Sequence, residues 1–238
     1  MTRTLITGGT RGIGAAIALR LAADGHDLVL GYLRDDSAAS STSAAVRDLG
    51  VACDVVRADV CTDEGIASLF AAGELTGVVN NAGATYRFAP LAETPAEEVR
   101  RTYEVNLVGP TLVARAAVSA LAANGGVSVN ISSGAATLGS PGEYVHYAAA
   151  KAGLDTLTKG LGLEVAPLGI RVVGVAPGLI ATTLHEATGD AGRIDRMAPQ
   201  IPLGRAGQPA EIADAVAWLM SDQAAYVTAT TLRVAGGR

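Results

Sequence analysis

Short runs of consecutive apolar residues alternate along the chain with longer segments of helical periodicity. In runs such as Leu28–Leu30 and Val172–Val173 the apolar residues are adjacent rather than alternate. A strand with this pattern buries both of its faces, which is typical of a parallel sheet that is covered by helices on each side. The alternation therefore predicts an α/β fold with a doubly wound parallel sheet and right-handed crossovers.

Seven segments are predicted as strands: Thr4–Thr7, Asp27–Tyr32, Asp54–Ala58, Gly77–Asn80, Val127–Ser132, Arg171–Ala176 and Thr231–Val234. Six are predicted as helices: Ala15–Ala23, Ser43–Leu49, Glu64–Ala72, Ala96–Leu121, Tyr147–Val165 and Ala210–Met220. Pro209 is typical of the first turn of a helix. No repeat or linker divides the 238 residues, so a single domain over residues 1–238 is predicted.

Composition excludes several classes of protein. Apolar residues make up 49% of the chain and charged residues 17%, which is enough for a core and too little charge for a disordered chain. The net charge of −5 argues against a nucleic-acid partner. No apolar run approaches the ~20 residues that cross a bilayer, and the few His and Cys residues show no metal-binding spacing. The N-terminus has no signal-peptide features, so a cytoplasmic location is predicted.

A glycine-rich motif, Thr7–Gly14, follows the first predicted strand and opens the first helix. Glycines allow a tight turn and let the backbone approach a pyrophosphate, while the helix N-terminus supplies N–H groups and positive potential. An ordinary turn is the alternative interpretation. The position directly after the first strand favours a dinucleotide site on a Rossmann fold.

A second motif places Tyr147 and Lys151 four residues apart on a predicted helix, so both lie on one face. The lysine ammonium favours the phenolate and would lower a tyrosine pKa that is ordinarily about 10. A solvated helix face is the alternative for such a pair. Ser133 follows a predicted strand, at the sheet edge where open α/β sheets bind ligands.

With these motifs the chain resembles the short-chain dehydrogenase/reductase family along nearly its whole length. Asp59–Val60 matches the family's adenine contact, and Asn80–Gly83 matches the end of its fourth strand. Asn106 matches the family's helix asparagine, and Pro177–Thr182 matches the segment that contacts the nicotinamide amide. Ala224–Gly237 is similar to the family's C-terminus. The chain is similar both to the β-ketoacyl reductase branch and to a glucose-dehydrogenase-like branch.

The resemblance implies a catalytic tetrad of Asn106, Ser133, Tyr147 and Lys151. Tyr147 would protonate a carbonyl oxygen during reduction, or accept the proton in the reverse direction. Ser133 would hydrogen-bond the same oxygen, and Lys151 would hold the nicotinamide ribose and lower the pKa of Tyr147. Asn106 would fix a water in the proton relay. Hydride transfer to a carbonyl carbon requires such donors because negative charge builds on the oxygen.

The serine assignment has one departure from the family pattern. Ser133 lies fourteen residues before Tyr147, where many family members have thirteen. Several branches carry the extra residue in a loop like Gly139–Tyr144, so Ser133 is retained. Ser132 is expected to point to the other face of the strand, and Ser140 is the outside alternative.

The resemblance also implies the cofactor-binding residues, which are Gly8, Thr10, Arg11, Gly12, Ile13, Gly14, Tyr32, Arg34, Asp59, Val60, Asn81, Ala82, Gly83, Tyr147, Lys151, Pro177, Gly178, Ile180 and Thr182. Enzymes that prefer NAD usually place a carboxylate where this chain has Tyr32. Arg11 and Arg34 are placed to meet a 2′-phosphate, with a solvated loop charge as the alternative for Arg34, and Asp35 and Asp36 would oppose a phosphate if they turned inward. NADP(H) is therefore favoured, with NAD(H) as the alternative.

The stretch Pro177–Arg205 is too long for an ordinary connection, and Leu179–Arg205 within it is predicted to be a substrate lid. Ala84–Phe88 and Gly134–His146 should form the other walls of the substrate site. The candidate substrate contacts, each with a surface or packing role as the alternative, are Tyr86, Arg87, Leu138, Glu143, Tyr144, His146, Leu184 and His185.

Three functions remain open. Gln200–Ala206 and Glu211–Tyr226 resemble the β-ketoacyl reductase branch, yet Asn124 and Leu168 stand where that branch often has carrier-docking arginines. The favoured function is therefore reduction of a small or medium ketone or aldehyde, with 3-oxoacyl-[acyl-carrier-protein] reductase as the alternative. A non-catalytic NADP(H)-sensing regulator is the third, which the intact tetrad argues against.

The resemblance further implies a homotetramer. Helices over Ala96–Leu121 and Tyr147–Val165 would pair with their symmetry copies, and Ala210–Arg238 would form a second interface. Apart from its own copies, the expected partner is a small carbonyl or alcohol substrate, with neither nucleic acid nor membrane.

Overall fold

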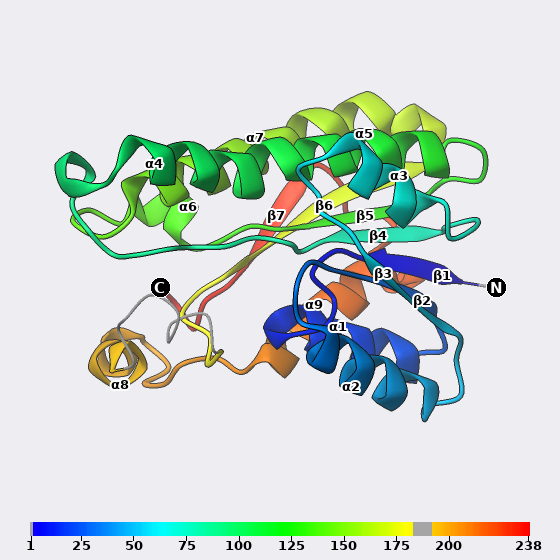
Figure 1. Cartoon of the computed structure of the whole chain (residues 1–238), viewed down its shortest axis with the longest axis horizontal. Helices are drawn as coiled ribbons and strands as arrows, with labels where there is room; N and C mark the ends of the chain where they lie inside the picture. Colours follow the sequence, from blue (N-terminus) through cyan, green and yellow to red (C-terminus); the bar gives the residue numbers. More distant parts are fainter. Residues whose placement is uncertain (1, 183–191) are drawn as a thin grey trace.

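A computed structural model describes residues 2–182 and 192–238. Its centre is one parallel sheet in the order β3-β2-β1-β4-β5-β6-β7 (Figure 1). The strands are β1 Arg3–Ile6, β2 Asp27–Tyr32, β3 Cys53–Arg57, β4 Gly77–Asn80, β5 Gly126–Ile131, β6 Ile170–Pro177 and β7 Thr230–Val234. The order reverses between β1 and β4, which creates the crevice where open α/β sheets bind ligands. The predicted doubly wound α/β domain is confirmed.

The helices cover both faces of this sheet. They are α1 Gly12–Ala23, α2 Asp36–Arg47, α3 Asp63–Phe70, α4 Ala96–Tyr103, α5 Gly109–Leu121, α6 Ala135–Leu138, α7 Val145–Val165, α8 Arg193–Met197 and α9 Pro209–Met220. Figure 1 shows α1, α2 and α9 on one side, with α3, α4, α5 and α7 on the other. The sheet is therefore the middle of three layers.

Adjacent apolar residues in the strands are explained by these layers. Leu5 packs into a buried cluster with Val113 of α5, whereas its neighbour Ile6 packs into a second cluster with Ile17 of α1 and Ile212 of α9. Successive side chains of a strand point to opposite faces, so a strand with helices on both sides needs apolar residues at consecutive positions.

Four of the predicted helices differ from the structure by no more than three residues at an end, and the other two differ more. The helix predicted over Ser43–Leu49 begins at Asp36 and ends at Arg47. The carboxylate of Asp35 accepts a hydrogen bond of 2.9 Å from the N–H of Ala38 and so caps the helix start. Serine and threonine make up most of the helix before the predicted start at Ser43. Their low helix propensity is the reason why these first turns were not predicted.

The helix predicted over Ala96–Leu121 is divided. A π-helical turn, Glu104–Val108, separates α4 from α5. A π-helical turn bonds each residue to the fifth rather than the fourth residue before it, and such turns are frequent at functional sites. Hydrophobic periodicity alone does not distinguish this turn from a continuous helix.

The short helices α6 and α8 were missed because four or five residues are too few to show periodicity. The predicted lid, Leu179–Arg205, includes residues 183–191, which lie outside the described residues. The lid therefore stays a prediction.

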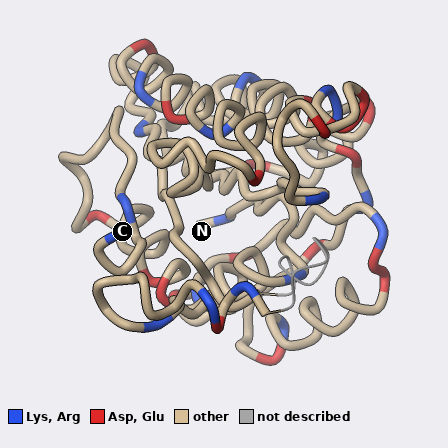
Figure 2. The backbone as a smooth tube through the Cα atoms, turned by 90° about the vertical axis from the view of Figure 1, so that its left-hand side faces the viewer, with Lys and Arg blue, Asp and Glu red and all other residues tan. Residues whose placement is uncertain are grey.

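Figure 2 shows Lys and Arg interspersed with Asp and Glu around the outside of the described chain, rather than gathered in one basic stripe. Within the described ranges no helix is both long enough and apolar enough to span a membrane. The same residues contain no cluster of three or more His, Cys, Asp or Glu that could hold a metal ion. The predicted cytoplasmic location stays a prediction.

Candidate active site

A cleft of about 780 Å³ opens at the carboxyl-terminal ends of the strands. All of the predicted cofactor-binding residues line it, and so does Ser133. Asn106 does not line the cleft and is fully buried behind it. The residues that sequence patterns placed on separate loops are therefore brought together at the predicted edge of the sheet.

Several positions of the loop between β1 and α1 require glycine. A Cβ atom on Gly14 would lie 2.1 Å from the carbonyl oxygen of Gly8. Gly8 and Gly12 have φ angles of +62° and +52°, which L side chains rarely adopt. Because α1 begins at Gly12, the first residues of the helix line the cleft, and a helix N-terminus of this kind favours anionic groups such as a pyrophosphate.

The end of β4 holds this loop in place. The side-chain amide of Asn81 donates hydrogen bonds of 3.0 Å to the carbonyl oxygens of Thr7 and Gly8. The Thr7 hydroxyl oxygen in turn accepts hydrogen bonds of 3.0 Å from the N–H groups of Asn81 and Ala82. Asn81 thus shapes the cofactor loop as well as lining the cleft. The role of Thr7 was missed, because one threonine at a strand end carries no distinctive pattern.

Tyr147 lies in the first turn of α7, and its half-buried side chain lines the cleft. Burial raises the pKa of the Tyr147 phenol, while a hydrogen bond with the Ser133 side chain lowers it in part. The Ser133 oxygen also accepts a hydrogen bond of 3.1 Å from the N–H of Ala135, which orients the hydroxyl. The phenol is therefore neutral at physiological pH, and a neutral phenol is able to donate a proton.

Lys151 lies one turn further along α7 and is also buried. Its ammonium donates a 2.9 Å hydrogen bond to the carbonyl oxygen of Ile131, and its Nζ lies 5.8 Å from the centre of the Tyr147 ring. Burial lowers the pKa of Lys151 to about 8, although nearby Asp155 raises it in part. The expectation that Lys151 lowers the pKa of Tyr147 is not met here, because burial of the phenol dominates.

Asn106 lies in the π-helical turn. Its side-chain amide donates hydrogen bonds of 2.7 Å to the carbonyl oxygen of Ala84 and 2.9 Å to that of Thr102. Its side-chain oxygen accepts a 3.2 Å hydrogen bond from the N–H of Ala84. A Cβ atom on Gly83 would lie 2.8 Å from that oxygen and 3.5 Å from the Lys151 Nζ. Asn106 thus ties the segment after β4 to the helix that backs the cleft.

The two other serines have different environments. The Ser132 hydroxyl is buried and donates a 3.3 Å hydrogen bond to the carbonyl oxygen of Lys151. Ser140 lines the cleft with a φ of +45°, in a turn where its carbonyl oxygen accepts hydrogen bonds from Glu143 and Tyr144. Of the three, the hydroxyl bonded to Tyr147 is that of Ser133.

Positively and negatively charged side chains lie close together where the cleft passes the end of β2. Arg11 forms an exposed ion pair of 3.6 Å with Asp35. The Tyr32 hydroxyl donates a 2.7 Å hydrogen bond to Asp36, whose side chain does not line the cleft. Arg34 is exposed at the same edge.

The segment after β6 closes the far side of the cofactor half. The carbonyl oxygen of Pro177 accepts a 2.7 Å hydrogen bond from Gly134, beside Ser133. Thr182 lies against the glycine loop, since a Cβ atom on Gly12 would be 3.8 Å from its methyl group. This segment therefore contacts both the residue that follows Ser133 and the glycine loop.

Four of the predicted substrate contacts line the cleft: Tyr86, Leu138, Glu143 and Tyr144. Two do not. Arg87 forms an ion pair of 3.8 Å with Glu98, and His146 is buried away from the cleft. Leu184 and His185 lie outside the described residues.

A buried arginine at the substrate end was missed. Both terminal nitrogens of Arg193, from α8, donate 2.7 Å hydrogen bonds to the Glu143 carboxylate. The guanidinium lies 4.4 Å from the centre of the Phe88 ring and 3.3 Å from the Tyr144 hydroxyl. The Tyr144 ring meets the Tyr147 ring edge to face, with 5.3 Å between their centres. The two charged partners are 50 residues apart, so no local pattern links them.

Known proteins are similar to this chain over nearly its whole length. A protein-family model described as enoyl-(acyl carrier protein) reductase matches residues 8–238. The chain is 42% identical to the oxidoreductase YgfF of Escherichia coli over 247 aligned positions, which cover both chains fully. It is 39% identical to 3beta-hydroxysteroid dehydrogenase 1 of Eggerthella lenta, covering 98% of this chain and 92% of the relative. It is 35% identical to the 3-oxoacyl-[acyl-carrier-protein] reductase FabG of Staphylococcus aureus, covering 100% and 98%.

Solved structures of similar fold indicate the same family. A short-chain type dehydrogenase/reductase from Mycobacterium marinum superposes with a TM-score of 0.93 at 30% identity, covering 99% of this chain and 94% of the other. A 3-ketoacyl-(acyl-carrier-protein) reductase from Brucella melitensis, in complex with NADH, gives 0.92 at 30% identity and covers 100% and 98%. The sequence, the fold and the site therefore agree that this chain belongs to the short-chain dehydrogenase/reductase family of oxidoreductases.

Proposed function

We propose that this protein reduces a small or medium ketone or aldehyde to an alcohol, and catalyses the reverse oxidation, with NADP(H). The observation that carries the proposal is the Tyr147 phenol, which is hydrogen-bonded to Ser133 and lies beside Lys151 at the wall of the cleft that the predicted cofactor-binding residues line. A neutral phenol in this position supplies the proton that carbonyl reduction requires.

When bound in the cleft, a reduced nicotinamide would supply the hydride that the carbonyl carbon accepts. Tyr147 donates its proton to the carbonyl oxygen, so that an alcohol and the oxidised cofactor result. Ser133 donates a hydrogen bond to the same oxygen and stabilises the negative charge that builds there. Lys151 would hold the nicotinamide ribose, and Asn106 would fix a water in the path that returns a proton to Tyr147.

The proposal is tested by following NADPH consumption with a panel of ketones, aldehydes, sugars and 3-ketoacyl thioesters. Turnover of small carbonyl compounds is expected. Preferential turnover of the thioesters would instead favour a 3-oxoacyl-[acyl-carrier-protein] reductase, as in the FabG relative. A protein that binds NADPH and oxidises none of it with any member of the panel would be a sensor, not an enzyme.

NADPH is expected to give a kcat/KM at least about tenfold above that of NADH, because a charge-assisted phosphate contact contributes roughly 1.5–3 kcal/mol. Arg11 and Arg34 line the ribose end of the cleft. Asp35 is engaged as a helix cap and ion-pair partner of Arg11, and Asp36 accepts the Tyr32 hydroxyl. Neither carboxylate is thus free to oppose a phosphate without giving up its own contact.

Arg11→Ala should shrink the NADPH-to-NADH ratio, chiefly by raising the KM for NADPH. Arg20→Ala is a matched control, since Arg20 lies near the far end of α1 and pairs there with Asp24 and Asp214. Equal efficiencies with the two cofactors in the wild-type enzyme would refute the NADP(H) assignment.

We also propose a homotetramer. Leu163 of α7 is 65% exposed, Trp218 of α9 is 39% exposed and Leu232 of β7 is 37% exposed, so both predicted interfaces carry apolar side chains in contact with water. Light scattering at micromolar concentration should give the mass of four chains. Leu163→Lys and Trp218→Lys should each reduce that mass, because each places a charge in one interface. A wild-type mass equal to one chain would contradict the proposal.

A further inference from the structure

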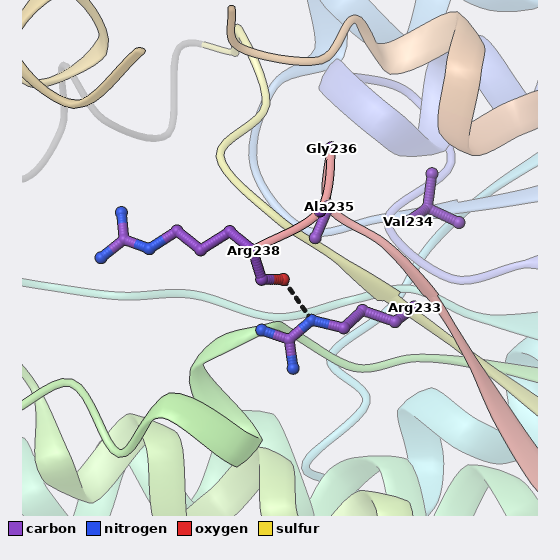
Figure 3. Close-up of a pocket in the computed structure, with 6 residues that line it drawn as sticks. Arg233, Val234, Ala235, Gly236 and Arg238 are labelled. Atoms are coloured by element: carbon purple, nitrogen blue, oxygen red, sulfur yellow. Dashed lines mark hydrogen bonds between the residues drawn. The ribbon is translucent and has the colours of Figure 1, made fainter. Parts of the chain in front are cut away.

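Two arginines of the cleft lining are each fixed by contacts with distant segments of the chain. Arg233 donates hydrogen bonds to the Thr137 hydroxyl and to the main-chain oxygen of Arg238, and Figure 3 shows its guanidinium turned toward that oxygen. Arg193 instead joins α8 to the residues around Tyr147. Neither arginine takes part in the proposed chemistry, but the contacts of Arg193 lead directly to a catalytic side chain.

Arg193 is buried against an acidic residue of the turn that precedes α7. Only 5% of its side chain is exposed, and its two terminal nitrogens donate hydrogen bonds of 2.7 Å to the two carboxylate oxygens of Glu143. A guanidinium and a carboxylate are both planar and match each other at two points, so paired bonds of this kind fix the orientation of both groups. The Glu143 side chain is therefore held at a set position relative to α8.

The turn that carries Glu143 is loosely held by its own contacts. Among the residues that the structure describes, a Cβ atom on Gly139 or on Gly142 would meet nothing within 4 Å. The N–H groups of Glu143 and Tyr144 both donate to the carbonyl oxygen of Ser140 at 3.3 Å, which is longer than the ~2.7–3.2 Å of most such bonds. The shape of the turn therefore depends on the partners of Glu143.

The segment after β4 meets the same turn. The N–H of Ala89 donates a 2.7 Å hydrogen bond to the main-chain oxygen of Glu143. The neighbouring Phe88 ring lies 4.9 Å from the Tyr144 ring, centre to centre, and its centre is 4.4 Å from the central carbon of the Arg193 guanidinium. A guanidinium over an aromatic ring is attracted to the electron-rich face of the ring. Arg193 thus contacts two of the three segments that meet here and itself comes from the third.

Tyr144 connects this arrangement to Tyr147. Its hydroxyl accepts a 3.3 Å hydrogen bond from Arg193, and its ring meets the Tyr147 ring edge to face, with 5.3 Å between the centres. Tyr144 also directly precedes α7, whose first turn holds Tyr147. A displaced Tyr144 ring would therefore remove one of the contacts that fix the direction of the Tyr147 phenol.

We infer that Arg193 is a positioning residue for the proton transfer, because together with Glu143 it holds Tyr144 against Tyr147 and so keeps the phenol directed at the carbonyl oxygen. The inference rests on the proposed carbonyl reduction and adds a residue that acts on it without contacting the reacting atoms. Displacement of a reacting group by about 1 Å costs about 10²-fold in rate, so a small change in the Tyr147 ring is sufficient for a measurable effect.

The first test replaces Arg193 with Met, which removes the guanidinium and keeps an unbranched side chain. Glu143 is 35% exposed, so water can solvate its carboxylate after the change. With acetone and acetophenone as probes and saturating NADPH, kcat is expected to fall at least about tenfold for both ketones. The Kd for NADPH should stay within about twofold, because Glu143, Tyr144 and Phe88 are not among the residues predicted to bind the cofactor.

The two ketones differ in size and so separate positioning from a role in the substrate wall. A loss confined to the KM of the larger acetophenone, with the kcat of both ketones unchanged, would make Arg193 a wall residue and overturn the inference. Arg20→Met is a matched control, since Arg20 pairs with Asp214 and so also joins two distant segments, and neither residue lines the cleft. It should leave both values of kcat unchanged.

A double-mutant cycle tests the path through Tyr144. If Arg193 acts through the Tyr144 ring, Arg193→Met should lower kcat by less than about twofold once Tyr144→Ala has removed that ring, because the two changes then act on one shared interaction. If Arg193→Met costs as much in the Tyr144→Ala enzyme as in the wild type, Arg193 acts by another route and the inference is overturned.

Fluorine NMR of the protein labelled with 3-fluorotyrosine gives a readout that needs no turnover. The chain has six tyrosines, and the spectra of Tyr144→Phe and Tyr147→Phe assign the two signals of interest. In Arg193→Met both signals should shift while the others keep their wild-type positions. If Arg193→Met loses the dispersion of all signals, Glu143→Asp, which keeps the charge and withdraws the carboxylate, takes its place with the same expectations.

The NMR result separates failure of this inference from failure of the proposed function. A Tyr147 signal that does not move would overturn the positioning role even where both ketones are reduced. A Tyr147 signal that shifts in a protein that reduces neither ketone would support the positioning role while the proposed reaction fails.

Discussion

Replacing Tyr147 with Phe is expected to lower kcat by at least about 100-fold, because positioned acid–base groups contribute roughly 10²–10⁴-fold. The change removes the proton donor but keeps the ring, whose edge-to-face contact with Tyr144 should survive. NADPH binding and the melting temperature should therefore remain close to wild type. Steady-state kinetics on the best substrate of the panel, with fluorescence titration of NADPH, measures both quantities.

Tyr103→Phe is a matched control, since it removes the same hydroxyl from a tyrosine that does not line the cleft. Ser133 and Ser132 offer a second matched pair. Ser133→Ala should reduce kcat because its hydroxyl bonds Tyr147, whereas Ser132→Ala should cost little because its hydroxyl bonds a main-chain oxygen inside the core. A Tyr147→Phe enzyme within threefold of wild type would refute the mechanism.

The direction of the pH dependence follows from burial of the phenol. The pKa of Tyr147 is raised, so the protonated form that reduction uses persists across the neutral range. Alcohol oxidation needs the phenolate as base, and that form gains population only as pH increases. Oxidation should therefore accelerate with pH while reduction does not.

The fold could be predicted because its determinants are local. Leu5 and Ile6 pack on opposite faces of the sheet, and adjacent apolar residues of this kind mark a strand buried on both sides. The predicted helix boundaries were wrong where the local helix propensity disagreed with the final structure. The serine-rich start of α2 depends on the Asp35 cap, and the π-helical turn around Asn106 is fixed by hydrogen bonds to Ala84 and Thr102.

The candidate site also has one part that the sequence predicts and another part that it does not. Residues of the glycine loop, the Tyr147–Lys151 pair and the strand ends all line one cleft, because each belongs to a short motif at a fixed place in a parallel sheet. The pairing of Arg193 with Glu143 depends on a contact between distant segments. No spacing in the sequence encodes that contact.

Replacing Lys151 with Met is expected to lower kcat about as far as the Tyr147 change, and to weaken NADPH binding roughly tenfold or more, since a hydrogen bond to a charged group contributes about 1.5–3 kcal/mol. Met keeps the length of the side chain, which limits the cavity left in the buried site. This double effect distinguishes Lys151 from Tyr147, whose replacement should spare the affinity for NADPH.

The pH dependence of cofactor binding offers a separate test of the same residue. Burial lowers the pKa of Lys151 to about 8, so its ammonium is present below that pH and is lost as the pH rises through it. Because the charged form holds the cofactor, the Kd of the wild-type enzyme for NADPH should increase above about pH 8, and this increase should be absent in Lys151→Met. Lys159→Met, an exposed lysine eight residues further along α7, should keep the wild-type profile. An inflection near pH 8 that survived in Lys151→Met would assign the titration to another group and remove Lys151 from cofactor binding.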